Sequence, residues 1–351
     1  PYNTGNEGWV YNDNVNDPRI KKWLGEVVGK EGEDLSRHDK WLCMMYPRLK
    51  LLHRLLAEEG VIFISIDDTE FSYLRLICDE IFKNFAEAIV WQKRTSPDAR
   101  KKLSSGHEYV LIYTKNPDQS LGLKLLPLEG KDAEAYTNPD SDPRGPWISS
   151  PFTAPGYRPN QMYPITTPTG KTMMPPKGRC WCNIEEVYQR LLSEGRMWFG
   201  ADGNGVPRRK TYLSEREGRG VWTWWTNSEV GYTQIATQEL AAILGKAVFD
   251  YPKPIRLISR IIQMASSDGD IILDSFAGSG TTAHAVLNMN KADGGHRKFI
   301  LVEMMDYAES ITAERVKRVI DGYGQGTNAV EGTGGDFTFY DLGPVLLLPN
   351  G

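Results

Sequence analysis

Residues 271–283 read Ile-Ile-Leu-Asp-Ser-Phe-Ala-Gly-Ser-Gly-Thr-Thr-Ala, an apolar run that leads directly into a glycine turn. The run predicts a buried strand, and Gly278 and Gly280 let the backbone turn sharply and approach a ligand without a Cβ in the way. A helix is predicted next, then a strand over 298–302 that ends at Glu303. A carboxylate there can accept hydrogen bonds from both hydroxyls of a ribose. The segment therefore predicts a Rossmann-like site for an adenosine-containing cofactor.

This unit alone leaves two cofactor classes open. Gly278, Gly280 and Ala283 also match the Gly-x-Gly-x-x-Ala fingerprint of nicotinamide-dependent enzymes. An oxidoreductase that prefers NAD would explain the glycine turn and Glu303, so the rest of the chain has to separate it from other adenosine-binding enzymes.

The segments on either side predict an α/β fold. Apolar residues at three- and four-residue steps predict helices over 41–56 and 308–320, and Pro254 stands where a helix can begin. Val61–Ile66 is continuously apolar, which predicts a strand buried on both faces, as in a parallel sheet covered by helices. Further strands are predicted over 87–92 and 109–115.

The middle of the chain, residues 117–238, differs in composition. It is rich in proline and glycine and concentrates aromatic residues, with basic residues such as Arg208-Arg209-Lys210 between them. A domain of short elements needs large side chains to bury enough apolar area, so most of these aromatics are predicted to form its core. The chain thus divides into residues 1–116, an inserted loop-rich domain over 117–238, and residues 239–351.

Charge is distributed unevenly along the chain, whose formal net charge is -4. Residues 93–220 carry 20 basic against 14 acidic side chains, and the remainder carries 21 against 31. A basic middle suggests that this region meets a polyanion. Cys180-x-Cys182 lacks a second pair or histidines, so we expect reduced thiols and no metal site. No apolar run is long enough for a membrane span.

The first five residues separate the cofactor classes. Pro1-Tyr2-Asn3-Thr4-Gly5 resembles the end of Asp-Pro-Pro-Tyr-Asn-Thr-Gly, the catalytic signature of DNA amino-methyltransferases that use S-adenosylmethionine. The order of signature, inserted domain and glycine turn resembles the β class of these enzymes. Residues 202–210, Tyr163-Pro-Ile and Phe249-x-x-Pro-Lys-Pro254 further resemble the modification subunits of type III restriction-modification systems. The resemblance covers nearly the whole chain.

The resemblance implies a fold as well as an activity. The fold would be α/β, a doubly wound, Rossmann-like S-adenosylmethionine-dependent methyltransferase sheet with circularly permuted motif order. Residues 1–116 would be the catalytic half of the methyltransferase domain and 239–351 its cofactor-binding half. Residues 117–238 would be a target-recognition domain.

The resemblance also implies individual roles. Pro1 and Tyr2 would be catalytic, with Tyr2 stacking on a base flipped out of the duplex. Glu303 would hold the ribose, and Lys253 would help to position the methionine end of the cofactor. The implied cofactor-binding residues are Lys253, Asp274, Phe276, Gly278, Gly280, Thr281 and Glu303. The implied DNA-binding residues are Arg208, Arg209 and Lys210.

The implied reaction is methyl transfer to the N6 amine of adenine in DNA. The sulfonium of the cofactor is already an excellent leaving group, so positioning and preorganised acceptors for the amine would do most of the catalysis without a metal. Asn3-Thr4-Gly5 and the type III resemblance favour adenine over the N4 amine of cytosine, which stays an alternative. His107-Glu108 could approach the target base, although a structural role is favoured.

The chain departs from the family pattern at its start, because the aspartate and first proline of the signature would precede residue 1. We therefore hypothesise that the chain as written binds cofactor but methylates DNA weakly or not at all. Finding no gain in methyl transfer after restoring the upstream residues would refute this. The resemblance implies double-stranded DNA as partner, a homodimer, a helicase-nuclease restriction subunit, and the cytoplasm of a prokaryote. A DNA-recognition subunit without its own activity is the alternative from another class.

Overall fold

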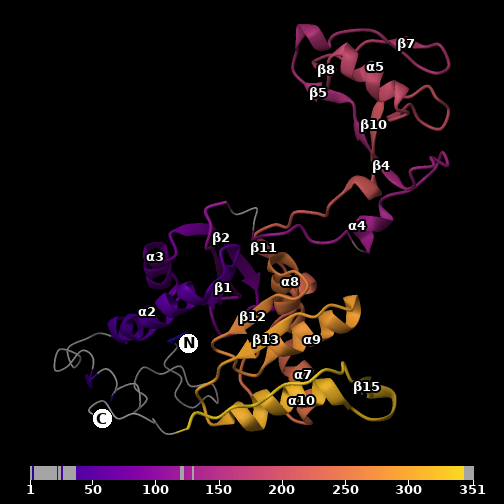
Figure 1. The fold of residues 1–351 in the computed structure, drawn as a ribbon. Helices are drawn as coiled ribbons and strands as arrows, with labels where there is room; N and C mark the ends of the chain where they lie inside the picture. The colour runs from indigo at the N-terminus through magenta and orange to yellow at the C-terminus, as the bar shows by residue number, and fades with distance from the viewer. Residues whose placement is uncertain are drawn as a thin grey trace. The chain divides into compact units, whose positions relative to one another are not determined.

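The computed structural model describes residues 2–3, 22, 25–26, 37–118, 122–128 and 130–343. These residues form two compact units (Figure 1): a first unit that runs up to Lys124 and resumes at Trp222, and an inserted unit over Leu125–Val221. The inserted unit is shorter than the block defined by composition. Trp224-Trp225 forms strand β11, which pairs in parallel with Val90-Trp91, so this segment belongs to the first unit.

The first half of the first unit combines two helices with a four-stranded sheet of order β1-β3-β2-β11. Its core contains buried residues of α2, α3, β1 and β3, among them Trp41, Leu74 and Tyr113. The bounds are α2 Arg37–Leu55, β1 Val61–Ile66, α3 Phe71–Ile81, β2 Asn84–Gln92, β3 His107–Thr114 and β11 Trp224–Trp225.

The prediction of β1 as a parallel strand buried on both faces is wrong. β1 pairs antiparallel with β3, from Val61 opposite Thr114 to Ile66 opposite Tyr109. Only Ile66 is fully buried, and the other five residues are half-buried. A continuous apolar run reports burial but not the direction of the partner strand, which is set by the connection between the strands.

The second half of the first unit is built around the glycine turn. β12 (Ile271–Asp274) runs into the turn, α9 (Thr281–Asp293) follows it, and β13 (Lys298–Leu301) pairs in parallel with β12. The predicted strand–turn–helix–strand unit is thereby confirmed. Its other helices and strands are α6 Asn227–Val230, α7 Thr233–Leu244, α8 Ile255–Ala265, a π-helical turn Ala308–Ala313, α10 Glu314–Asp321, β14 Gly322–Tyr323 and β15 Val330–Glu331.

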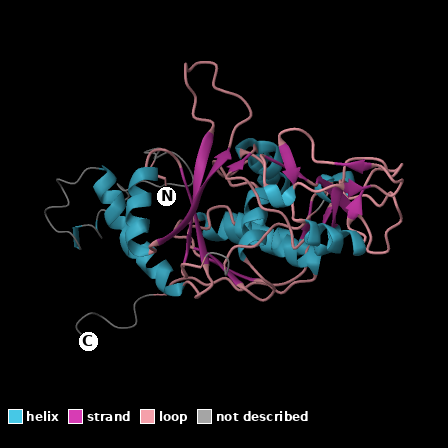
Figure 2. Cartoon of the chain, turned by 90° about the horizontal axis from the view of Figure 1, so that it is seen from above, coloured by secondary structure: helices cyan, strands magenta, loops and turns pink. Residues whose placement is uncertain are grey.

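The unit is mixed α/β, and the β12–α9–β13 arrangement is Rossmann-like. Its helices and strands are distinguished by colour in Figure 2. This agrees with the expected Rossmann-like fold; the described strands of this unit form the four-stranded sheet and the separate pairs β12-β13 and β14-β15. In the part of the chain that is described, no helix is long and apolar enough to cross a membrane.

The inserted unit consists of short strands around an aromatic core. Phe152, Tyr163, Trp181 and Phe199 are buried, which confirms the prediction that most aromatics of this region are core. Tyr157 is an exception, with 72% of its surface exposed. The bounds are α4 Lys131–Glu134, β4 Trp147–Pro151, β5 Thr153–Pro155, β6 Ile165–Thr166, β7 Thr172–Met173, β8 Arg179–Trp181, α5 Glu185–Ser193, β9 Met197–Trp198 and β10 Arg208–Tyr212.

Candidate functional site

The glycine turn after β12 requires glycine for two reasons. Gly278 and Gly280 have φ of 51° and 77°, the left-handed region that other residues rarely adopt. A Cβ on Gly280 would also lie 3.2 Å from the carbonyl oxygen of Thr312, and one on Gly278 would lie 3.3 Å from the Phe249 ring. The turn is therefore packed against the π-helical segment on one side and Phe249 on the other.

Asp274 orders the start of this turn. Its carboxylate accepts hydrogen bonds from the Phe276 amide (3.2 Å) and the Thr282 hydroxyl (2.5 Å). Burial raises the pKa of Asp274, against the effect of these two donors. These contacts show that Asp274, one of the implied cofactor-binding residues, orders the turn.

The Glu303 carboxylate lies beside the glycine turn and is hydrogen-bonded to it. One carboxylate oxygen accepts the Gly278 amide proton at 2.8 Å, and the other accepts the amides of Met304 (2.8 Å) and Met305 (3.1 Å). A carboxylate offers about four acceptor positions, so roughly one is left for a ligand hydroxyl. A grip on two ribose hydroxyls would require one of these backbone bonds to open.

Arg315 stabilises the glycine turn through hydrogen bonds and was not predicted from the sequence. Its guanidinium is 1% exposed and donates to the Ser279 hydroxyl (3.0 Å), the Ser279 carbonyl (3.2 Å) and the Thr281 hydroxyl (2.9 Å). Burial lowers the pKa of Arg315 to about 10. Burial likewise lowers the pKa of His284, its neighbour at 3.3 Å, to about 3, so His284 is neutral. An arginine in an amphipathic helix carries no sequence signal for this role.

The predicted catalytic residue Tyr2 lies in a cluster around Glu108. The Tyr2 hydroxyl forms 2.9 Å hydrogen bonds with Glu108 Oε2 and Ser65 Oγ. The ammonium groups of Lys93 and Lys253 donate to the two oxygens of Glu108 at 2.9 and 3.0 Å. Lys253 Nζ also lies 4.7 Å from the centre of the Tyr2 ring, a cation–π contact. Pro1 lies outside the described residues.

The positive charges of Lys93 and Lys253 offset the cost of burying the Glu108 carboxylate. Burial of the Glu108 side chain, which is 8% exposed, opposes ionisation, but Lys253 and Lys93 outweigh it and hold the pKa of Glu108 below its usual range. Burial, followed by the charge of Glu108, raises the pKa of Tyr2 well above its usual value, so the phenol stays protonated. The cluster is thus a carboxylate whose bonds are already satisfied by two lysines and a phenol.

Lys253 connects this cluster to the glycine turn. Its backbone carbonyl accepts the Thr281 hydroxyl at 3.1 Å, while its ammonium binds Glu108. Phe276, in the turn, packs with Tyr2 against the core formed by α2 and α3. Tyr2, the residue that follows β2, the start of β3 and the glycine turn therefore meet at one place.

Two cavities border the cluster. One of about 700 Å³ is lined by residues that include Lys93, Tyr232, Phe249 and Tyr251. A smaller one of about 220 Å³ is lined by residues that include Asp67, Thr69 and Lys101. Lys93, Arg94 and Asp98 line both cavities. The described residues contain no group of three or more potential metal ligands.

The three predicted DNA-binding residues lie on β10 of the inserted unit and differ in exposure. Arg209 is exposed, and Arg208 is half-buried with its guanidinium bonded to Ser149. The prediction that Lys210 binds DNA is contradicted by its surroundings. Lys210 is 4% exposed and forms ion pairs with Asp140 and Asp142, so its ammonium cannot reach a phosphate in this conformation. Successive side chains of a strand point to opposite faces, and Lys210 lies on the buried face of β10.

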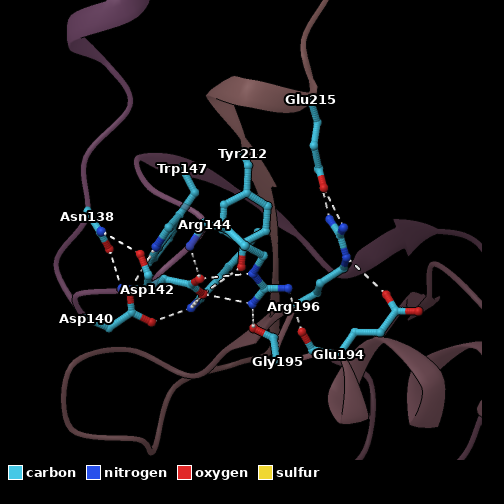
Figure 3. Close-up of polar contacts among 11 residues, drawn as sticks. Asn138, Asp140, Asp142, Arg144, Trp147, Glu194, Gly195, Arg196, Tyr212 and Glu215 are labelled. Atoms are coloured by element: carbon cyan, nitrogen blue, oxygen red, sulfur yellow. Dashed lines mark hydrogen bonds and ion pairs between the residues drawn. The ribbon is translucent and has the colours of Figure 1, made fainter.

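Asp142 is the centre of this buried network (Figure 3). It accepts hydrogen bonds from the Arg144 guanidinium (3.0 and 2.9 Å), the Lys210 ammonium (2.9 Å) and the Tyr212 hydroxyl (2.7 Å). Arg144 is the largest cause that holds the pKa of Asp142 far below its usual range. The network is a polar core beside β4 and β10 of the inserted unit.

Comparison with known proteins shows the family of the chain. The family described as DNA methylase matches residues 1–314. The chain belongs to this family. It is 37% identical to the StyLTI Mod subunit, a type III restriction-modification enzyme of Salmonella typhimurium, over 86% of the chain and 47% of that protein. It is 33% identical to the type II methyltransferase M.KpnI of Klebsiella pneumoniae over 86% of the chain and 73% of that protein.

Among solved structures, the S-adenosyl-L-methionine complex of TTHA0409 from Thermus thermophilus matches 80% of the chain and 78% of that protein. The sequence identity is 17% and the TM-score is 0.39. The chain spans about half the length of the StyLTI Mod subunit.

In this chain, the cofactor-binding residues expected from the sequence fall into two groups. Asp274, Phe276, Gly278, Thr281 and Glu303 lie in or beside the glycine turn, as does Gly280. Lys253 differs from expectation, because its ammonium points into the Tyr2–Glu108 cluster. Arg315 is the residue that the sequence did not assign. For Glu108 a structural role was favoured over an approach to the target base, and its bonds to Tyr2, Lys93 and Lys253 agree with a structural role.

Proposed function

We propose that this DNA methylase transfers a methyl group from S-adenosylmethionine to the N6 amine of an adenine flipped out of duplex DNA, as the modification component of a type III-like restriction-modification system. The proposal includes the partners that this role brings: double-stranded DNA, a second copy of the chain, and a helicase-nuclease restriction subunit in the cytoplasm of a prokaryote.

One observation carries the proposal. Lys253 bonds through its carbonyl to Thr281, at the glycine turn, and through its ammonium to the cluster around Tyr2. The segment that would hold a nucleoside cofactor and the residue that would stack on a base are therefore joined by a single residue. An oxidoreductase has no need for this link, and it also leaves Tyr2-Asn3 unexplained.

The residues of the turn fit an adenosine-containing cofactor. The left-handed glycines keep the backbone free of Cβ atoms at the turn, and Glu303 is fixed beside it with roughly one acceptor position for a ribose hydroxyl. Asp274 and Arg315 hold the turn in this conformation from opposite sides. When bound, S-adenosylmethionine would supply an activated methyl group on its sulfonium.

The residues of the cluster fit the binding of a base. Tyr2 offers a flat ring whose hydroxyl is fixed by Glu108 and Ser65, so the ring loses little freedom when a base stacks on it. Glu108 positions Tyr2 and Lys253 and does not act on the amine, because Lys93, Lys253 and Tyr2 already use its oxygens. Asn3 holds the backbone beside Tyr2 through its bond from Arg37 (2.8 Å).

Two measurements test the proposal. Calorimetric titration of the chain with S-adenosylhomocysteine, with NAD as the control, should give selective binding in the micromolar range, about -8 kcal/mol. Preference for NAD would refute it. The complete protein, incubated with DNA and labelled S-adenosylmethionine, should yield N6-methyladenine on nucleoside mass spectrometry. N4-methylcytosine would instead assign the cytosine reaction, and no methylation despite cofactor binding would favour a DNA-recognition subunit.

A further inference from the structure

The excess positive charge of the middle of the chain is concentrated in one loop. The basic loop, residues 93–106 between β2 and β3, carries five basic side chains and one acidic side chain. It supplies four of the six excess positive charges of residues 93–220. The inserted unit, residues 125–221, is nearly balanced, with 13 basic against 11 acidic side chains. The polyanion suggested by the charge pattern therefore has its strongest attraction in the first unit.

The root of the basic loop is tied to the Tyr2–Glu108 cluster. Lys93 Nζ bonds to Glu108 at 2.9 Å, and the amides of Lys93 and Arg94 both donate to the Gly106 carbonyl, at 2.9 and 3.3 Å. The loop thus leaves and re-enters the sheet directly beside the residue proposed to stack on a base. A ligand held by the loop would lie next to that residue.

The interior of the basic loop is braced by its one acid. Asp98 receives the Arg100 guanidinium through two 2.9 Å bonds, its amide donates to Ser104 Oγ at 2.9 Å, and its carbonyl accepts the Lys101 amide at 2.9 Å. The acid therefore neutralises Arg100 and fixes the turn. The conformation that presents the remaining cations is ordered from within the loop.

The outer side chains of the basic loop have no such partners. Arg94, Lys101 and Lys102 are exposed, and none forms an ion pair within the described ranges. Leu103 follows them with 91% of its surface exposed. An apolar side chain held in water beside two lysines has no role in the packing of the chain. It matches the composition of protein segments that grip phosphates and insert a side chain between bases.

We propose that the basic loop is a docking surface for duplex DNA, on which Lys101, Lys102 and Arg94 contact phosphates and Leu103 enters the base stack beside the target. This inference rests on the proposed function and deepens it, because it assigns the phosphate contacts beside the target base to the first unit. Insertion of Leu103 lowers the cost of extruding a base, because the side chain replaces part of the lost stacking.

The test is binding of a fluorescent duplex of mixed sequence, followed by anisotropy at several salt concentrations. The double variant Lys101→Ala/Lys102→Ala should bind more weakly and show a salt slope smaller by about 1.8, since each phosphate contact contributes about 0.9. The control is Lys298→Ala/Lys317→Ala, which removes the same charge from exposed positions on β13 and α10. It should change the slope little.

Leu103→Ala tests the inserted side chain separately. A duplex with one mismatch is opened at lower cost, so the wild-type chain should bind it more tightly than the matched duplex. Leu103→Ala should reduce this preference several-fold and leave the salt slope unchanged.

The proposal is overturned if the lysine variant retains the wild-type affinity and slope. It is also overturned if the variant alters self-association in sedimentation while DNA binding persists, or if the wild-type chain binds S-adenosylhomocysteine but no DNA. DNA binding through the loop without S-adenosylhomocysteine binding would instead refute the proposed function.

Discussion

Replacing Glu108 by glutamine tests whether charge holds the candidate site together. Glu108→Gln keeps the shape of the side chain but removes the charge that Lys93 and Lys253 share. The amide oxygen can still accept from one lysine, whereas the amide nitrogen is a donor and confronts the other. The variant should therefore lose one charge-assisted hydrogen bond and weaken a second.

The magnitude follows from burial. Hydrogen bonds to charged groups contribute about 1.5–3 kcal/mol each. Removing one partner of a fully buried pair costs about 3–5 kcal/mol. Here Glu108 is buried, but the side chains of Lys93 and Lys253 are 19% and 23% exposed and can regain water. We expect a loss of about 2–4 kcal/mol in the free energy of unfolding, or roughly 4–8 °C in melting temperature.

The effect should depend on pH in a defined direction. Although burial opposes ionisation, Lys253 and Lys93 lower the pKa of Glu108 in the folded state. A depressed pKa stabilises the fold above the ordinary glutamate pKa of about 4.3, and this contribution is lost as pH falls through the folded value. The difference between wild type and Glu108→Gln should be largest near pH 7 and should shrink below about pH 4.

Calorimetric melting of both proteins between pH 7 and about pH 2.5 measures this difference, because the loss is expected below about pH 4. Glu314→Gln is the matched control, because its ion pair with Arg318 is on the surface (34% and 42% exposed) and contributes about 0–0.5 kcal/mol. In a Lys93→Met background, the cost of Glu108→Gln should fall by about 1–3 kcal/mol, because the uncompensated ammonium is gone. A cost under about 0.5 kcal/mol at pH 7, or one that does not change with pH, would refute the reasoning.

Three further changes test other parts of the site. Gly280→Ala should lower the free energy of unfolding by more than about 2 kcal/mol and weaken S-adenosylhomocysteine binding. The control Gly294→Ala should cost only the left-handed backbone strain of about 1–2 kcal/mol, because nothing lies within 4 Å of its Cβ position. Equal losses of stability in thermal melting would contradict this. Arg315→Met should weaken S-adenosylhomocysteine binding about tenfold in calorimetry by releasing Ser279 and Thr281, and unchanged affinity would show that the turn holds its shape alone. Asp142→Asn should cost about 3–5 kcal/mol in urea unfolding at pH 7, with a smaller cost below about pH 4 because the pKa of Asp142 is depressed, and a pH-independent cost would show that its charge is not what the network uses.

Sequence reasoning succeeded where a local pattern implies one conformation. A short apolar run, two glycines and a helical stripe can only be arranged as strand, turn and helix, and β12, the turn and α9 follow this order. It failed for β1, whose neighbour depends on a residue pairing more than forty positions away. It also failed for Lys210, because three consecutive basic residues on a strand alternate between two faces and only the fold decides which face is buried.

The same distinction explains why the charged network around Glu108 was not predicted as one site. Lys93, Glu108 and Lys253 lie in segments separated by 15 and 145 residues, and no periodicity links them. Each of these side chains is charged, and by itself it would be expected on the surface. Together they form a buried network, because a buried carboxylate between two ammonium groups is stable where an isolated one is not. Such a network depends on all its members. It can therefore report, through the melting temperature of Glu108→Gln, whether the glycine turn and the Tyr2 segment act as one site.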